Sequence, residues 1–69
     1  MKVVIIGSGN VATHIAKALR AVNIDVVQIW SYHHENASLL ANEVNAIAIK
    51  DLAEVNVNAD LCIIAVKDD

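Results

Sequence analysis

The chain alternates between short apolar runs and longer segments in which apolar and polar residues are interleaved. Runs rich in apolar residues, typical of buried strands, cover residues 3–6, 25–30, 46–49 and 61–66, and the second of them also contains Asp25 and Gln28. Between the first three runs, apolar residues recur every three or four positions, which predicts helices over residues 10–22 and 36–44. We also expect one helical turn within residues 51–55. Strands that alternate with helices in this way predict an α/β fold with a parallel sheet.

The handedness of strand–helix–strand connections predicts the topology of this sheet. Right-handed crossovers place both helices on one face and give the strand order 3-2-1-4. No further helix is predicted to cover the other face. The bare apolar area would equal or exceed the largest patch on a typical monomer. We therefore expect residues 1–69 to be the N-terminal portion of a larger protein.

A glycine turn follows the first apolar run directly. Gly7 allows a sharp exit from the strand, and Gly9 lets a pyrophosphate approach the backbone. Ala12 has the small side chain that lets the helix lie close to the strand, and the helix N-terminus near Asn10 faces the phosphates. This context predicts a Rossmann-like dinucleotide-binding domain. A strand-to-helix turn without a ligand, or with a different nucleotide, is the alternative.

Charge and composition exclude several other classes of protein. The net charge is −3 and the five Lys and Arg residues are scattered, which argues against nucleic-acid binding and membrane-surface binding. No apolar run approaches the roughly 18 residues of a membrane span, and the start does not resemble a signal peptide. Cys62 is the single cysteine, so it has no disulfide or metal-binding partner, and we expect it to be buried. We expect a cytoplasmic protein without a metal.

The loop after the second strand bears on the choice of cofactor. NAD-binding members of this fold carry an Asp or Glu there, whereas residues 28–34 contain no acid. An acid would repel a 2′-phosphate, and its absence favours NADP over NAD. Ser31, Tyr32 and His33 can donate hydrogen bonds to that phosphate, and His33 or His34 can add positive charge. The alternative is an ordinary solvated loop.

Other residues near the expected ligand position are harder to interpret. Ala65, Val66 and Lys67 end the fourth strand beside the first, so we expect them to line the cofactor site. Lys67 either approaches a phosphate or is solvated. Trp30 is either a packing residue or a wall of the adenine pocket.

Three stretches, residues 5–12, 30–37 and 59–69, together resemble a known group of proteins. They are similar to the N-terminal domain of NADP oxidoreductases related to pyrroline-5-carboxylate reductase and deazaflavin-dependent NADP oxidoreductase. The resemblance assigns three roles. It implies pyrophosphate binding by the first turn, 2′-phosphate binding by Ser31, Tyr32 and His33, and a place near the nicotinamide for Ala65, Val66 and Lys67. The residues of that first turn are Gly7, Ser8, Gly9, Asn10 and Val11.

The sequence departs from that group at two positions. Tyr32 stands where an arginine is common, which weakens the NADP assignment. Asp68 stands where the reductase branch has a proline, which argues against a true pyrroline-5-carboxylate reductase. The group's substrate site lies in a C-terminal domain absent from residues 1–69, so no catalytic residue can be assigned. We expect a homodimer formed through that domain.

Two functions remain open from the sequence. One is the NADP-binding domain of an oxidoreductase that transfers a hydride between nicotinamide and a small imine or carbonyl substrate. The other is a non-catalytic domain that senses a dinucleotide for regulation. Both need the same phosphate-binding turn, so the motif does not separate them.

Overall fold

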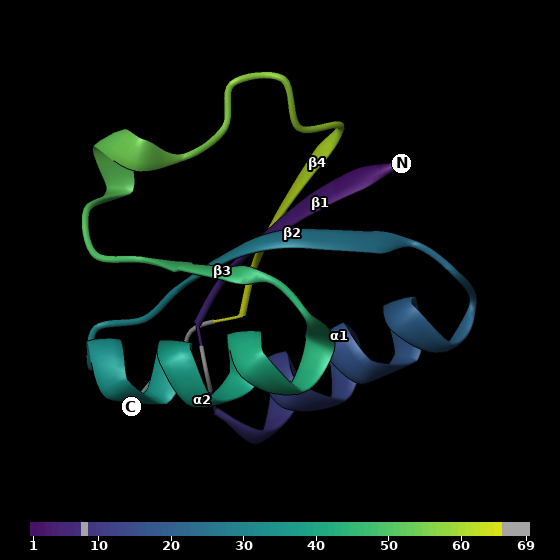
Figure 1. The fold of residues 1–69 in the computed structure, drawn as a ribbon, viewed down its shortest axis with the longest axis horizontal. Helices are drawn as coiled ribbons and strands as arrows, with labels where there is room; N and C mark the ends of the chain where they lie inside the picture. Colours follow the sequence, from purple (N-terminus) through teal and green to yellow (C-terminus); the bar gives the residue numbers. More distant parts are fainter. Residues whose placement is uncertain (8, 66–69) are drawn as a thin grey trace.

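The computed structural model describes residues 1–7 and 9–65. The described residues form a four-stranded parallel sheet in the order β3-β2-β1-β4, with helices on one side (Figure 1). The α/β class and the strand order predicted from the sequence are therefore confirmed. The elements are β1 (Lys2–Ile6), α1 (Asn10–Ala21), β2 (Asp25–Trp30), α2 (His34–Val44), β3 (Ile47–Ile49), a 3₁₀ helix η1 (Leu52–Glu54) and β4 (Leu61–Ile64).

The start of α2 differs from the prediction, which began that helix at residue 36. His33 is the N-cap, and its carbonyl accepts hydrogen bonds from the backbone N–H groups of Asn36 and Ala37. His34 is already helical, and its ring lies 3.3 Å (Nε2 to Oγ) from Ser38 one turn later. His34 thus belongs to the helix rather than to the preceding loop.

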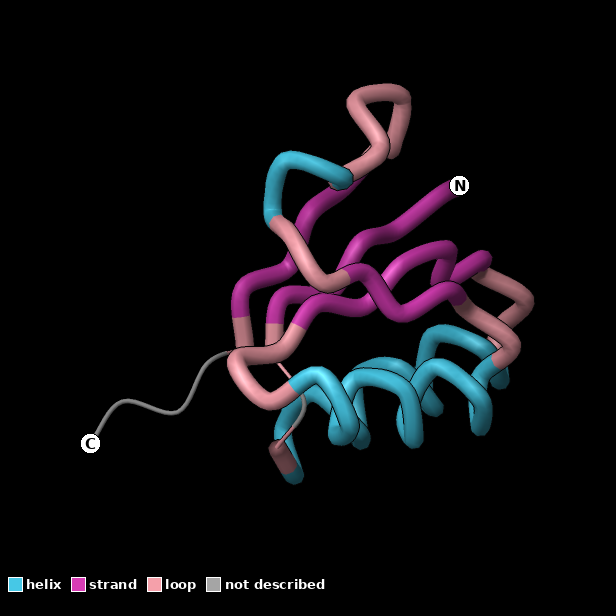
Figure 2. The backbone as a smooth tube through the Cα atoms, turned by 60° about the vertical axis from the view of Figure 1, so that its left-hand side comes forward, coloured by secondary structure: helices cyan, strands magenta, loops and turns pink. Residues whose placement is uncertain are grey.

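The core lies between the sheet and the two helices. Figure 2 shows α1 and α2 side by side along one face of the sheet. Ala12 is fully buried, as expected for the small residue that lets α1 approach β1 closely. The buried residues of this layer are Val3, Ile5, Ala12, Ala16, Val26, Ile29, Ala37, Leu40, Ala41 and Val44.

A β-bulge in β2 sets which side chains reach the other face. Val3 pairs with Val26, but the next residue, Val4, pairs with Gln28, so Val27 is the extra residue. Side chains at paired positions share a face, and Gln28 therefore lies on the face opposite the helices. The bulge thus turns a polar side chain toward that face.

Residues 50–60 lie over that opposite face (Figure 2) and hydrogen-bond to β2. The Gln28 side-chain amide donates to the Glu54 carbonyl (3.0 Å), and its oxygen accepts from the Asn56 N–H (2.7 Å). The Trp30 indole N–H donates to the Lys50 carbonyl (3.1 Å). Trp30 is thus a packing residue that holds residues 50–60, called the connector below, against β2. The face is therefore partly covered, contrary to the expectation of a bare surface.

The uncovered part of the face is at β4. Cys62 pairs with the fully buried Val4 but is itself exposed, and Ile64 is 72% exposed. The prediction of a buried Cys62 is therefore wrong, because it assumed that an apolar strand is covered on both faces. The predicted strand residue Val66 lies outside the described residues. Within the described part of the chain, no helix has the length and apolar content needed to cross a membrane.

Candidate functional site

Three of the segments predicted to bind the cofactor meet at the carboxyl edge of the sheet. The Gly7 N–H donates to the Trp30 carbonyl at 2.6 Å, which joins the turn after β1 to the loop after β2. The Ala65 N–H donates to the Ile6 carbonyl at 2.8 Å, which brings the end of β4 beside the same turn. Ligands of open parallel sheets bind outside this edge. The described candidate residues of these segments therefore lie close together, at the edge where such a ligand would bind.

Gly7 is a glycine that the backbone itself requires. Its φ is 133°, in a region that residues with side chains rarely adopt. It is also buried between the ends of β1 and β2. The sharp turn predicted from the sequence is present, and the fold alone explains this glycine.

Gly9 is different, because the fold does not require a glycine there. Its φ of −74° and ψ of −168° are extended angles that any residue adopts. Among residues 1–7 and 9–65, no atom beyond its chain neighbours lies within 4 Å of a β-carbon built at Gly9. The space beside Gly9 is open, and a side chain would fill it. This is the arrangement that close approach of a pyrophosphate needs.

The N-terminus of α1 opens onto that space. Gly9 is its N-cap and has no side chain to cap the first turn, which contains no acidic residue. The Gly9 carbonyl accepts from the Thr13 N–H at 2.9 Å, so the helix is regular from its first turn. Asn10 and Val11 are both exposed, and Val11 is 63% exposed. Free backbone N–H groups and the positive end of the helix dipole suit an anionic ligand. The described residues of the turn therefore fit a dinucleotide phosphate.

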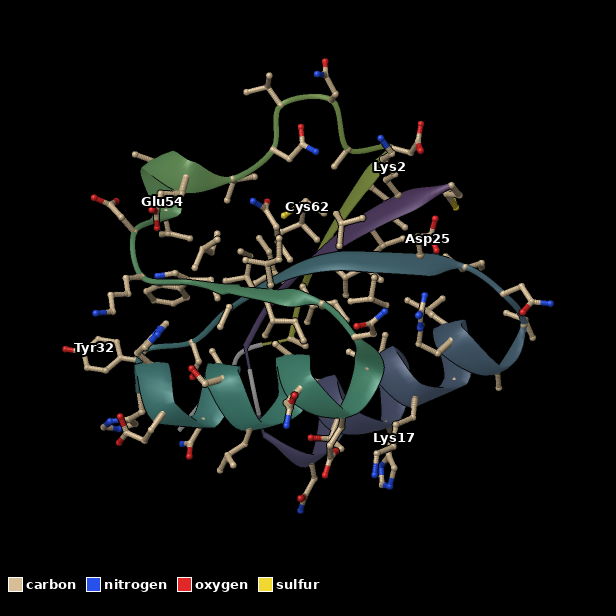
Figure 3. The ribbon with its side chains drawn as sticks, viewed as in Figure 1. Lys2, Lys17, Asp25, Tyr32, Glu54 and Cys62 are labelled. Carbon is tan, nitrogen blue, oxygen red and sulfur yellow. The ribbon has the colours of Figure 1, made fainter. Side chains whose placement is uncertain are left out.

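The loop after β2 combines one anchored residue with two exposed ones. Ser31 is 7% exposed, and its Oγ accepts a hydrogen bond from the His33 backbone N–H at 3.3 Å. Tyr32, between them, is 87% exposed and extends away from the ribbon at the start of α2 (Figure 3). The Tyr32 and His33 rings meet edge to face, with centroids 5.7 Å apart and an angle of 72°. The loop thus presents two polar rings outside the carboxyl edge.

Four other candidate positions fall elsewhere or outside the described residues. His34, considered as a source of positive charge, lines a shallow groove with Ser38, Ala46 and Ala48, between α2 and β3. Its Nδ1 is buried and has no hydrogen-bond partner among the described residues. The structure therefore does not group His34 with Tyr32. Ser8, Val66 and Lys67 lie outside the described residues.

Sequence reasoning missed the backbone hydrogen bond that joins the turn after β1 to the loop after β2. The Trp30 carbonyl that holds Gly7 belongs to a residue whose side chain faces the connector. A contact made by a main-chain atom leaves no signal in residue types. No group of three or more His, Cys, Asp and Glu side chains in residues 1–7 and 9–65 could hold a metal ion.

Comparison with known proteins adds independent information. A crystal structure of a "putative NADP oxidoreductase" from Bacteroides fragilis matches 97% of this chain, with a TM-score of 0.92 and 46% sequence identity. The match covers 26% of that protein, so this chain spans about a quarter of its length. No curated protein matches the sequence. The grouping with pyrroline-5-carboxylate reductase and deazaflavin-dependent oxidoreductase is not confirmed. Residues 1–69 match the family described as shikimate / quinate 5-dehydrogenase, and the chain therefore belongs to that family.

Proposed function

We propose that this chain is the NADP-binding part of an oxidoreductase. The open space at Gly9, against the uncapped N-terminus of α1, is the observation that carries the proposal. The fold leaves that glycine unexplained, whereas a bound pyrophosphate explains it. A dehydrogenase family match and a structural match to a protein named as an NADP oxidoreductase support the same activity.

Each segment of the carboxyl edge has a role in this proposal. Backbone N–H groups of residues 9–11, at the start of α1, bind the pyrophosphate, because the first turn holds no acidic side chain that would repel it. Gly7, whose own N–H is bonded to the Trp30 carbonyl, shapes the turn. The adenosine end of the cofactor, with its 2′-phosphate, binds at Ser31, Tyr32 and His33. No acidic side chain in residues 28–34 repels that phosphate. Ala65, Val66 and Lys67 line the nicotinamide side. The bound cofactor supplies the hydride chemistry, and the chain holds and orients it.

The remaining parts of the protein belong to the same proposal. The substrate, a small imine or carbonyl compound, binds in a C-terminal domain beyond residues 1–69, and this domain also forms a homodimer. The length of the matched structure, of which this chain covers 26%, leaves room for such a domain. The proposal includes a cytoplasmic location, where the exposed Cys62 thiol would stay reduced. It retains the relationship to the pyrroline-5-carboxylate and deazaflavin-dependent group.

The test is a binding titration of the full-length protein and its Gly9→Val variant with NADPH. The valine side chain enters space that the described residues leave empty, so the variant should fold while the pyrophosphate is blocked. We expect cofactor fluorescence to change on binding to the original protein and not on mixing with the variant. Circular dichroism checks that both are folded. Unchanged NADPH affinity in a folded Gly9→Val protein would refute the assigned site.

A further inference from the structure

Tyr32 is an aromatic residue that the fold does not use. The chain contains one Trp, one Tyr and no Phe. The indole of Trp30 is partly buried and holds the connector at the Lys50 carbonyl. Tyr32 is 87% exposed, and its ring meets the His33 ring edge to face. At least one face of the phenol ring is therefore open to a planar ligand.

The backbone that carries this ring is nevertheless fixed. The hydrogen bond from the His33 N–H to the buried Ser31 Oγ closes a turn across Tyr32. His33 is in turn the N-cap of α2, and its carbonyl accepts hydrogen bonds from that helix. On the other side, the Trp30 carbonyl is held by the Gly7 N–H at 2.6 Å. The ring thus stands on an anchored loop that is joined directly to the phosphate turn.

This position corresponds to one part of a dinucleotide. With the pyrophosphate at Gly9, a nucleoside whose ribose lies over the end of β2 brings its base to the loop after that strand. Resting on the proposed function, we propose that the Tyr32 ring is the surface on which the adenine of the cofactor stacks. Ser31 and His33 hold the ring in place, and the phenol hydroxyl does not bind the 2′-phosphate. Stacking uses the open face of the ring, which is the part that the fold leaves exposed.

The experiment compares Tyr32→Ala and Tyr32→Phe in the full-length protein by calorimetry. The probes are NADPH, adenosine 2′,5′-bisphosphate and reduced nicotinamide mononucleotide, which lacks adenine. We expect Tyr32→Ala to weaken binding of the first two probes by a similar factor, about 5- to 150-fold, because loss of base–aromatic stacking has that magnitude. Tyr32→Phe should bind all three as the original protein does, since it keeps the ring. Binding of the mononucleotide should not change in either variant.

The control variant is Val57→Ala, which truncates a side chain that is 93% exposed on the connector. It should bind all three probes normally. If Tyr32→Phe loses as much affinity as Tyr32→Ala, the hydroxyl is the binding group and stacking is refuted. If Tyr32→Ala binds NADPH normally, Tyr32 has no role in binding and the inference falls, while the proposed NADP binding at the Gly9 turn stands. If the original protein binds neither NADPH nor the bisphosphate, the proposed NADP binding is refuted, and the inference that rests on it is refuted with it.

Discussion

Gly7 and Gly9 are separated by one residue, yet the structure predicts different consequences for stability when each is replaced by alanine. Gly7 has φ 133° and is buried, so an alanine there must adopt a conformation that side chains disfavour. Such strain typically costs about 1–3 kcal/mol. We expect Gly7→Ala to lower the free energy of unfolding by about that amount.

The same substitution at Gly9 has two small and opposing effects. Its φ of −74° suits alanine, and the added β-carbon meets no atom of the described part of the chain within 4 Å. Lower entropy of the unfolded chain should stabilise Gly9→Ala by about 0.4–1 kcal/mol. Gly9 is also the N-cap of α1, and alanine is a poorer N-cap than glycine by roughly 0.5–1 kcal/mol. The two effects nearly cancel, so we expect a net change within about 0.5 kcal/mol.

Urea unfolding of the full-length protein without cofactor measures this difference. Gly7→Ala should unfold at a clearly lower urea concentration, and Gly9→Ala close to the original midpoint. NADPH titration of the same samples should show weaker binding for Gly9→Ala. Equal loss of stability in the two variants would mean that the fold itself needs Gly9. The argument that its open space serves a ligand would then fail.

Two other predictions follow from the loop after β2 and from β4. Ser31→Asp should shift the preference from NADPH toward NADH by at least about 30-fold in calorimetry, because a carboxylate repels the 2′-phosphate by about 2 kcal/mol. Unchanged relative affinities would refute the placement of that phosphate. The exposed Cys62 thiol should react readily with a small thiol reagent in residues 1–69 and be protected in the full-length protein, where we expect later residues to cover β4. Equal reaction rates would contradict that expectation.

The strands and their order could be predicted because the relevant signals are local. Residues 25–30 are rich in apolar residues, with Val26, Val27 and Ile29, and form β2 with the expected bounds. The bulge inside β2 could not be predicted in the same way. Val26 and Val27 are both apolar, so the sequence does not reveal that the register shifts there and turns Gln28 to the opposite face. The pairing of two strands decides that register, and single residues do not record it.

The covering of the opposite face was missed for a related reason. Gln28 and Trp30 bind the connector through the main-chain carbonyls of Glu54 and Lys50, more than fifteen residues away. Periodicity describes neighbours within one element and carries no information on such contacts. The expectation for Cys62 failed because an apolar run does not say whether both faces of the strand are covered.

At the candidate site, the sequence predicted which segments take part, but not which residues of each segment the fold holds and which it leaves open to a ligand. In each of two segments, a residue held by the fold stands close to a residue that the fold leaves open. Gly7 is fixed by its φ of 133° and its bond to Trp30, and Gly9 borders empty space. Ser31 is buried and hydrogen-bonded, and Tyr32 is 87% exposed.

This pairing gives a reason to regard the carboxyl edge as a binding surface. An open residue on a mobile backbone would lose conformational entropy when a ligand orders it, and part of the binding free energy would be spent on that ordering. Here the Gly9 carbonyl is already held by the Thr13 N–H, and Ser31 and His33 are hydrogen-bonded on either side of Tyr32, when the protein folds. Substitutions that remove an anchoring interaction should therefore lower stability, and truncation at the open positions should mainly weaken binding. Residue types alone do not make this distinction, because both glycines of the turn look equivalent in the sequence.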